Sequence, residues 1–556
     1  MPRMTGAQFL AETMKAYGVT HAFYMPMIVV RGLVEMEKVG IRRIMTHGEK
    51  AAAYMADGYA RAAHRPAVCM AQNVGAVNLA AGLQDAYLAQ SPVVAITGRR
   101  SQLQHSLNSY QEIDHIQPFS AVTKYNVMVD SAEDLPHMLR QAFRAATSGA
   151  PGPAHLGFLG TSGNVVSDGE ADLEVIVDEP FAKIPALRIE PEPAMVREAA
   201  RVLSEARRPV IVAGGGVTAS QAQREVVQLA EMLSIPVATS LNGKGTIVED
   251  HPLSVGVCGS YSRWCANRVV SEADLVVFIG SHTGSQVTND WTIPPKGTPV
   301  LQIDIDGAEL GRSYPAKAVL QGDAKATVAR LIEALEPVGA RVEWVGRAQQ
   351  LVQEWREEVA PLANSDAVPM RPERLCKEIT DYLPENGVLV SDTGHSGIWT
   401  GTMIELKHPG QTFIRCAGSL GWAFPGAMGV KCALPDRPVL SFTGDGGFWY
   451  HIGELETALR YGINTVTVVN NNASLNQEKR GNERVYGDQP GNSDELWKLL
   501  DINFARLAED IGCFGIRVEQ PGELQGALDQ AFASGKPAVV DVVTDIEGIA
   551  PRAWTP

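Results

Sequence analysis

The 556-residue chain has little of what marks secreted, membrane-spanning or nucleic-acid-binding proteins. Its seven cysteines include no CxxC pair, and their spacing fits neither a zinc site nor a disulfide framework. No apolar run is long enough to span a bilayer, and the first residues lack the apolar stretch of a signal peptide. The net charge of −15 argues against nucleic acid and anionic membranes as partners. These absences favour a cytoplasmic enzyme.

What is present is typical of an α/β protein. Hydrophobic residues make up 45% and charged residues 20% of the chain, an ordinary globular composition, and the length is too great for one core. Short apolar runs alternate with helical patterns, which is typical of parallel sheets covered on both faces. We therefore expect three α/β domains with doubly wound parallel sheets, at residues 1–175, 190–337 and 365–556.

The strands are predicted at short apolar runs, and the stretches between the domains at changes of composition. The acid- and proline-rich stretch 170–192 is expected to be a linker, and the charged stretch 341–358 a helical connector. The predicted strands are 22–24, 43–46, 67–71, 93–97 and 154–157 in the first domain, 210–213, 237–240, 275–279 and 300–305 in the second, and 388–391, 439–442, 466–469 and 538–543 in the third.

The most informative segment runs from Gly444 to Asn472. The turn Gly444-Asp445-Gly446 follows a predicted strand, and 24 residues later Asn471-Asn472 follows the next one. A right-handed βαβ unit places both strand ends at one edge of a parallel sheet, so we expect Asp445 and Asn472 to lie close together. A carboxylate and an amide oxygen suit a hard cation such as Mg²⁺, with phosphate oxygens and water as further ligands. Glycines at this turn allow a phosphate to approach the backbone.

This spacing resembles the fingerprint of thiamine diphosphate (ThDP) enzymes, in which Mg²⁺ ties the diphosphate to the protein. Other motifs in the same order resemble the acetohydroxyacid synthase, or acetolactate synthase, group, and they cover essentially the whole chain. The resemblance implies a pyrimidine-binding, a central and a diphosphate-binding domain, in that order. The matching motifs are Met45-Thr46-His47-Gly48-Glu49, Gly75-Ala76-Val77-Asn78, Tyr110-Gln111-Glu112, Gly394-His395 and Gly418-Ser419-Leu420-Gly421-Trp422-Ala423-Phe424-Pro425.

The resemblance assigns four of these residues to the chemistry of the cofactor. Glu49 matches the glutamate that hydrogen-bonds the pyrimidine ring and promotes loss of the thiazolium C2 proton. Leu420 matches the apolar wedge that keeps the cofactor bent, Gly418 supplies a carbonyl to its amino group, and Gln111 lies near the thiazolium. The plainer alternatives are a helix-terminal acid for Glu49, a core residue for Leu420 and a surface loop residue for Gln111.

The remaining site residues follow from the same resemblance, with ordinary loop positions as the alternative. The metal ligands would be Asp445, the Asn472 side chain and the Ser474 backbone. The residues expected to contact the cofactor are Gly394, His395, Ser396, Gly418, Leu420, Gly444, Gly446, Gly447, Asn472 and Leu475.

Departures from the family pattern bear on the reaction. Related decarboxylases have an acid near position 28 and a histidine pair in place of Tyr110-Gln111-Glu112, and these groups move protons. Ile28 cannot do so. The resemblance therefore implies slow protonation of the enamine and its capture by a carbonyl acceptor, with Ile28 facing the cofactor. The apolar stretch 25–28 suits either an apolar acceptor pocket or tighter packing.

The sequence leaves FAD binding open. The second domain resembles the FAD site of acetohydroxyacid synthases at Gly214-Gly215-Gly216, Asp304-Ile305-Asp306 and Gly322-Asp323. However, the family's Gly-Thr-Arg-Phe stretch is replaced by Gly280-Ser281-His282-Thr283, which lacks the arginine. Glycine-rich turns after strands are also expected in any doubly wound domain.

We expect a ThDP- and Mg²⁺-dependent carboligase or lyase. It would decarboxylate a pyruvate-like 2-oxo acid and pass the enamine to an aldehyde or ketone, giving a 2-hydroxyketone or acetohydroxy acid. The alternatives are an FAD-dependent 2-oxo acid oxidase, a 2-oxo acid decarboxylase and a catalytically silent nucleotide-binding subunit. Retention of Glu49, Asp445 and Asn472 argues against the silent subunit. The family also implies a homodimer or homotetramer in which Glu49 and Asp445 of different subunits serve one cofactor.

Overall fold

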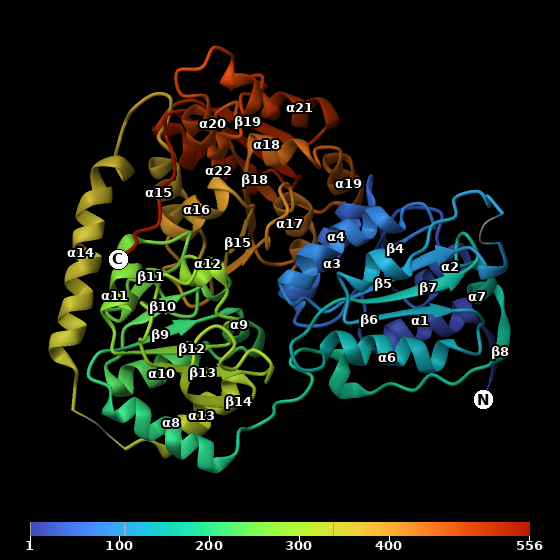
Figure 1. The fold of residues 1–556 in the computed structure, drawn as a ribbon. Helices are drawn as coiled ribbons and strands as arrows, with labels where there is room; N and C mark the ends of the chain where they lie inside the picture. The colour runs from blue at the N-terminus through green and yellow to red at the C-terminus, as the bar shows by residue number, and fades with distance from the viewer. Residues whose placement is uncertain (1, 105–106, 337–338) are drawn as a thin grey trace.

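The computed structural model describes residues 2–104, 107–336 and 339–556, and it contains three α/β domains (Figure 1). Each domain has a six-stranded parallel sheet, which confirms the predicted fold class. In Figure 1 the N-terminal domain is blue to teal, the central domain green and the C-terminal domain orange to red. The helix α14 (Val342–Ala363) runs along the outside from the central to the C-terminal domain, and it confirms the predicted helical connector.

The N-terminal sheet has the strand order β3-β2-β4-β5-β7-β6. Its strands are β2 (His21–Tyr24), β3 (Arg42–Met45), β4 (Ala67–Ala71), β5 (Val93–Arg99), β6 (Tyr125–Val129) and β7 (Ala154–Leu159). The helices of this domain are α1 (Gly6–Ala16), α2 (Val30–Lys38), α3 (Glu49–Ala63), α4 (Ala76–Leu88), α5 (Ile116–Ser120), α6 (Leu135–Thr147) and α7 (Asn164–Asp168).

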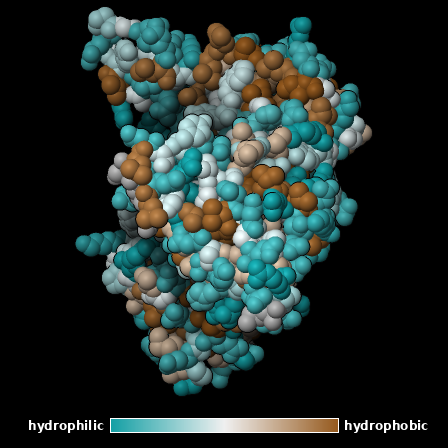
Figure 2. All heavy atoms as spheres, turned by 90° about the vertical axis from the view of Figure 1, so that its right-hand side faces the viewer, coloured by the Kyte–Doolittle hydropathy of each residue, from teal (hydrophilic) through white to brown (hydrophobic). Residues whose placement is uncertain are grey.

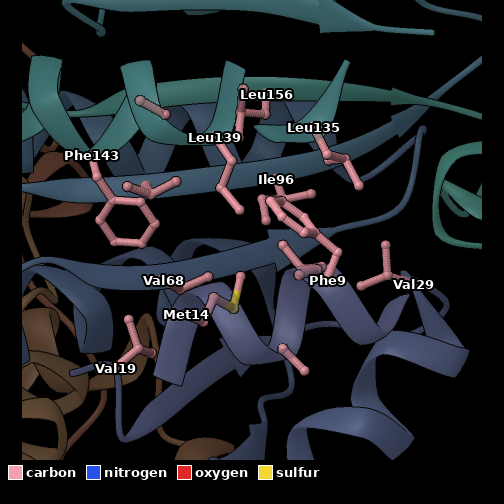
Figure 3. Close-up of a cluster of buried hydrophobic side chains, with 14 of the residues drawn as sticks. Phe9, Met14, Val19, Val29, Val68, Ile96, Leu135, Leu139, Phe143 and Leu156 are labelled. Atoms are coloured by element: carbon pink, nitrogen blue, oxygen red, sulfur yellow. The ribbon is translucent and has the colours of Figure 1, made fainter. Parts of the chain in front are cut away.

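Successive residues of the inner strands point to opposite faces of this sheet and enter different cores. Val68 and Ile96 pack with side chains of α1 and α6, and Figure 3 shows these groups pointing toward one another. Cys69 and Ala95 face the other way, toward α3 and α4. Because both faces are covered, the strand sequences are apolar throughout rather than alternating.

The stretch predicted as a linker is partly folded onto the N-terminal domain, so that prediction was wrong in part. The strand β8 (Glu170–Asp172) pairs antiparallel with β1 (Arg3–Thr5), and Phe181 is buried in the core beside α6. The acidic side chains of this stretch also bind the domain, because Asp178 accepts hydrogen bonds from Arg140 and Arg144.

The central sheet has the order β11-β10-β9-β12-β13-β14. Its strands are β9 (Pro209–Ala213), β10 (Val237–Thr239), β11 (Ser254–Val257), β12 (Leu275–Ile279), β13 (Val300–Asp304) and β14 (Ala316–Gln321). Its helices are α8 (Pro193–Glu205), α9 (Gly215–Ser220), α10 (Gln223–Leu233), α11 (Trp264–Glu272), α12 (Ser285–Thr288) and α13 (Ala324–Ala334).

The C-terminal sheet has the order β16-β15-β17-β18-β20-β19. Its strands are β15 (Val388–Ser391), β16 (Thr412–Arg415), β17 (Val439–Gly444), β18 (Val466–Asn471), β19 (Phe514–Val518) and β20 (Ala538–Val543). Its helices are α15 (Pro372–Tyr382), α16 (His395–Thr402), α17 (Ala423–Ala433), α18 (Asp445–Trp449), α19 (Glu454–Tyr461), α20 (Lys479–Tyr486), α21 (Phe504–Ile511) and α22 (Leu524–Ala533).

The N-terminal and C-terminal domains share a core in which α3 packs closely against α17. A Cβ atom at Gly58 would lie 2.1 Å from the carbonyl oxygen of Gly426, and one at Gly429 would lie 1.9 Å from that of Met55. The backbones therefore touch where side chains are absent. Phe424, Met428 and Phe448 continue this core into the C-terminal domain.

Among the described helices, not one combines the length and the apolar character needed to cross a membrane.

A buried histidine pair in the N-terminal domain predicts acid sensitivity. Thr97 Oγ1 lies 3.0 Å from His115 Nδ1 and 2.8 Å from His155 Nε2. Burial lowers the pKa of His115 from the ordinary 6.5 to about 4, and that of His155 well below its ordinary value. Below pH 6.5 the unfolded chain therefore binds more protons than the folded one. The stabilisation is complete above this pH and is lost as the pH falls toward 4.

We expect the free energy of unfolding to fall by about 2 kcal/mol for each of these histidines between pH 7.5 and pH 5. Denaturant unfolding at both pH values measures this change. The variant His115→Gln should show a smaller loss, whereas the exposed His408→Gln should lose as much as wild type. Equal losses in all three proteins would contradict the assignment.

Candidate active site

A cavity of about 320 Å³ lies at the carboxyl edge of the C-terminal sheet. It is formed where loops leave β15, β17 and β18, the edge at which parallel sheets bind ligands. Twelve residues that the sequence singled out line it: Gly394, His395, Ser396, Gly418, Leu420, Gly444, Asp445, Gly446, Gly447, Asn472, Ser474 and Leu475. The wall is completed by Tyr261 of the central domain, Thr393, Asn470 and the segment 476–478, none of which was predicted from the sequence.

Asp445 is held at the base of this cavity by backbone amides from two loops. Its Oδ1 accepts a hydrogen bond from the Gly446 amide at 2.8 Å, and its Oδ2 accepts one from the Ser474 amide at 2.8 Å. Asn472 Oδ1 accepts a hydrogen bond from the Ser474 hydroxyl at 2.7 Å. Ser474 therefore contacts both of the other residues that are expected to bind a metal.

The chemistry of this group fits a hard cation. Burial raises the pKa of Asp445 to about 6, although the amide hydrogen bonds of Gly446 and Ser474 oppose the shift. Over the described ranges no basic side chain forms an ion pair with Asp445, and no three His, Cys, Asp or Glu side chains gather as a metal site. One carboxylate with amide and backbone oxygens suits Mg²⁺, which keeps water and phosphate ligands.

The neighbouring backbone leaves room for a phosphate. A Cβ atom at Gly446 would lie 2.4 Å from Leu475 Cδ2, and one at Gly447 would lie 2.8 Å from Thr443 Oγ1, so side chains at these positions would not fit. Gly394 adopts φ +64° before α16, and His395 and Ser396 in the first turn of that helix line the cavity. A helix N-terminus favours negative charge, so the site fits a diphosphate.

The loop that carries Gly418 and Leu420 is bound by two carboxylates that the sequence analysis missed. Asp85 of α4 accepts hydrogen bonds from three successive amides of this loop, and Asp392 accepts two more. Both carboxylates are buried. The pattern was visible in part, because Asp392 follows a strand as Asp445 does and Asp85 lies on an apolar helix face.

Glu49 lies at the first turn of α3 and does not line the cavity of its own chain. Its Oε2 accepts a hydrogen bond from Asn78 Nδ2 at 3.3 Å. A Cβ atom at Gly75 would lie 2.4 Å from Glu49 Oε1, so the glycine leaves the space that the carboxylate fills. Glu454 of the C-terminal domain accepts a hydrogen bond from the His47 amide at 3.0 Å and so holds the turn that leads to Glu49.

The other two expected residues also lie outside this cavity. Ile28 is completely buried in the N-terminal core, so the expectation that its side chain faces a cofactor needs correction. The sequence could not show which side of the loop Ile28 takes. The side chain that points outward is Met27, which is 59% exposed. Gln111 lies in a loop with φ +63° and is half-buried.

A second, much smaller cavity of about 50 Å³ lies where the sequence resembled an FAD site. Gln90 of the N-terminal domain and His282 both line it, and their Nε2 atoms lie 2.7 Å apart. Asp304 and Asp323 add negative charge, and Arg188 is bound to Asp323. Nucleotide-sized ligands need about 300 Å³ or more, and a pyrophosphate needs free cationic or amide donors. The residues present therefore do not fit FAD.

Comparison with known proteins agrees with the order of the domains. Residues 4–117 match the family model described as thiamine pyrophosphate enzyme, N-terminal TPP binding domain. Residues 196–331 match the central domain of the same enzymes, and residues 392–542 match their C-terminal TPP binding domain. Thiamine pyrophosphate is another name for ThDP.

Relatives that align over nearly the whole chain also indicate a thiamine pyrophosphate enzyme. The chain is 33% identical to a probable acetolactate synthase large subunit of Methanocaldococcus jannaschii, over 98% of this chain and 92% of the relative. It is 30% identical to the putative thiamine pyrophosphate-containing protein YdaP of Bacillus subtilis, over 100% and 94%. It is 29% identical to the acetolactate synthase isozyme 2 large subunit of Escherichia coli, over 99% and 97%. The chain therefore belongs to the thiamine pyrophosphate enzyme family, as an enzyme that resembles acetolactate synthase large subunits along its whole length.

Proposed function

We propose that this enzyme uses ThDP and Mg²⁺ to decarboxylate a pyruvate-like 2-oxo acid and to join the remaining fragment to an aldehyde or ketone. The product would be a 2-hydroxyketone or an acetohydroxy acid. The observation that carries the proposal is that Asp445, Asn472 and Ser474 line the same cavity as Gly418 and Leu420. The names of the relatives support acetolactate-type chemistry.

The chain's own residues would divide the work as follows. Asp445, Asn472 and Ser474 would hold Mg²⁺, while the amides at Gly447 and the start of α16 would bind the diphosphate. When bound, ThDP supplies a carbanion at C2 that attacks the 2-oxo group. Glu49 would hold a proton at the pyrimidine ring and so assist loss of the C2 proton.

The position of Glu49 supports a shared site. Glu49 does not line the cavity of its own chain, so a second copy would have to supply it, as a homodimer or a dimer of dimers. The N-terminal domain, which contains Glu49, also carries unburied apolar side chains that suit such an interface. They are Val74, Val77, Leu88, Leu103, Leu107, Tyr110, Ile113 and Ile116. Figure 2 faces this domain and shows apolar side chains gathered in the upper part of the view.

Mixing two inactive variants tests the shared site. At limiting ThDP and Mg²⁺, Glu49→Gln and Asp445→Ala homodimers should each show little activity, whereas a mixed dimer contains one site with both residues intact. After mild dissociation and reassociation we expect part of the wild-type activity to return. Differently tagged subunits confirm the exchange by mass. Complete exchange without any recovered activity would contradict a site formed by two chains.

The products formed from pyruvate test the reaction itself. No acid replaces the proton relay at the Met25-to-Ile28 loop, so a coupled four- or five-carbon product should exceed acetaldehyde when a carbonyl acceptor is present. Met27→Asp should raise the share of acetaldehyde, because position 27 is the exposed one. Val34→Asp, an exposed apolar position on α2, is the matched control. Mass spectrometry of the products gives the ratio, and mainly acetaldehyde from wild type would indicate a decarboxylase instead.

A further inference from the structure

The loop from Ala417 to Ala423 lies between β16 and α17 and places Gly418 and Leu420 at the cavity. It contains two glycines, and Gly421 adopts φ +85°. A glycine-containing loop outside any sheet has high conformational freedom, so an external constraint is needed to keep it in one shape.

Asp85 provides this constraint from the N-terminal domain. Its Oδ1 accepts a hydrogen bond from the Ala417 amide at 2.5 Å, and its Oδ2 accepts from Gly418 at 3.2 Å and Ser419 at 2.8 Å. The side chain is completely buried. Three successive amides therefore share one carboxylate that belongs to a different domain.

Asp392 holds the other end of the loop. It directly follows β15, and it accepts hydrogen bonds from the Gly421 amide at 3.1 Å and the Ala423 amide at 3.0 Å. Burial raises the pKa of Asp392 to about 6, which these amide bonds oppose. Leu420 is thus the residue between the two carboxylates, and its own amide is bound by neither.

An ion pair does not explain why either carboxylate is buried. Across residues 2–104, 107–336 and 339–556 neither forms a salt bridge. The nearby Arg415 binds the carbonyls of Cys416 and Ala417 instead. A buried carboxylate is costly unless charge-assisted hydrogen bonds offset its desolvation. Here those bonds come from the backbone of this loop and, for Asp392, also from the Thr393 amide.

We propose that Asp85 and Asp392 are positioning residues that fix the loop 417–423, so that the Gly418 carbonyl and the Leu420 side chain are presented to the cofactor in one geometry. The proposal rests on the proposed function for its catalytic consequence, but the constraint on the loop is a property of the protein alone. Misplacement by about 1 Å is enough to lower a rate about 100-fold.

Amide hydrogen exchange of the cofactor-free protein tests the constraint directly. Asp85→Asn leaves one acceptor and adds a donor that opposes the amides, so Ala417, Gly418 and Ser419 should lose protection. Asp392→Asn should expose Gly421 and Ala423 instead. Asp304→Asn is the matched control, because Asp304 is buried in the central domain and accepts a backbone hydrogen bond from the Asp306 amide rather than from this loop.

Kinetics of the full-length enzyme with ThDP and Mg²⁺ test the consequence. We expect Asp85→Asn and Asp392→Asn to lower kcat by about 100-fold, because the loop is misplaced while Asp445 and Ser474 still bind the metal. The KM for ThDP should stay close to wild type. Asp304→Asn should retain the protection of all five amides and most of kcat.

The outcomes separate the proposals. Unchanged protection in both variants, or an equal loss in Asp304→Asn, would overturn the positioning role. Loss of protection with an unchanged kcat would overturn its catalytic part. A wild-type protein without ThDP-dependent turnover would overturn the proposed function, while the exchange result would still stand. If Asp85→Asn does not fold, Asp85→Glu keeps the charge and displaces the oxygens, and it should expose the same three amides.

Discussion

Replacement of Glu49 by glutamine should lower kcat by about 100- to 10,000-fold, the range over which a positioned proton donor or acceptor contributes. The amide retains the shape and the contact with Asn78, but it cannot exchange a proton with the pyrimidine ring. Binding of ThDP should remain close to wild type, because the residues that would hold Mg²⁺ and the diphosphate are unchanged. Deuterium exchange at C2 of bound ThDP, measured by NMR after acid quench, should slow by the same factor as kcat.

Two further variants sharpen this result. Glu12→Gln changes an exposed glutamate of α1 in the same domain and should not alter the exchange rate. Gly75→Ala places a methyl group within 2.4 Å of Glu49 Oε1, so it should displace the carboxylate and slow the exchange although Glu49 is still present. An exchange rate in Glu49→Gln equal to that of wild type would refute the role of Glu49 in activation.

Replacement of Asp445 by alanine should act on cofactor retention instead. It removes a carboxylate that two amides hold in place, and with it the bridge between Mg²⁺ and the diphosphate. We expect the apparent affinity for ThDP to fall by about 100-fold or more, which corresponds to about 3 kcal/mol. Calorimetric titration with ThDP at fixed Mg²⁺ measures the change.

The rescue pattern distinguishes this defect from that of Glu49→Gln. Saturating ThDP and Mg²⁺ should restore part of the activity of Asp445→Ala, whereas they should not help Glu49→Gln. Asp436→Ala, at an exposed position of the same domain, is the control and should bind ThDP normally. An unchanged affinity in Asp445→Ala would place the metal elsewhere.

The strands that could be predicted are mostly those inside the sheets. The interior strands β4, β5, β12 and β17 are covered on both faces, so their sequences are continuous apolar runs. Five strands of the six-stranded sheets were not predicted, and all of them lie at sheet edges: β6, β11, β14, β16 and β19. An edge strand such as β19 is only partly covered and mixes apolar with polar residues, which gives a weaker pattern.

In the site, too, an arrangement set by the nearby chain could be predicted, whereas a contact between distant segments could not. Asp445 and Asn472 could be placed together because the βαβ rule depends only on the chain between them. The contact of Asp85 with Gly418 joins residues of different domains that no spacing rule connects. The prediction that Ile28 faces the cofactor was wrong for a related reason. A loop residue next to a strand can turn toward the core or toward the cavity, and tertiary packing decides which.

The close contact of α3 with α17 limits how this protein can be recombined with its relatives. One core is built from both the first and the last domain, and glycines at Gly58, Gly426 and Gly429 let the two backbones touch. Chimeric proteins that inherit these two domains from different parents would juxtapose surfaces that were never matched. The first and last thirds of the gene are therefore a single unit of exchange, even though the central third separates them.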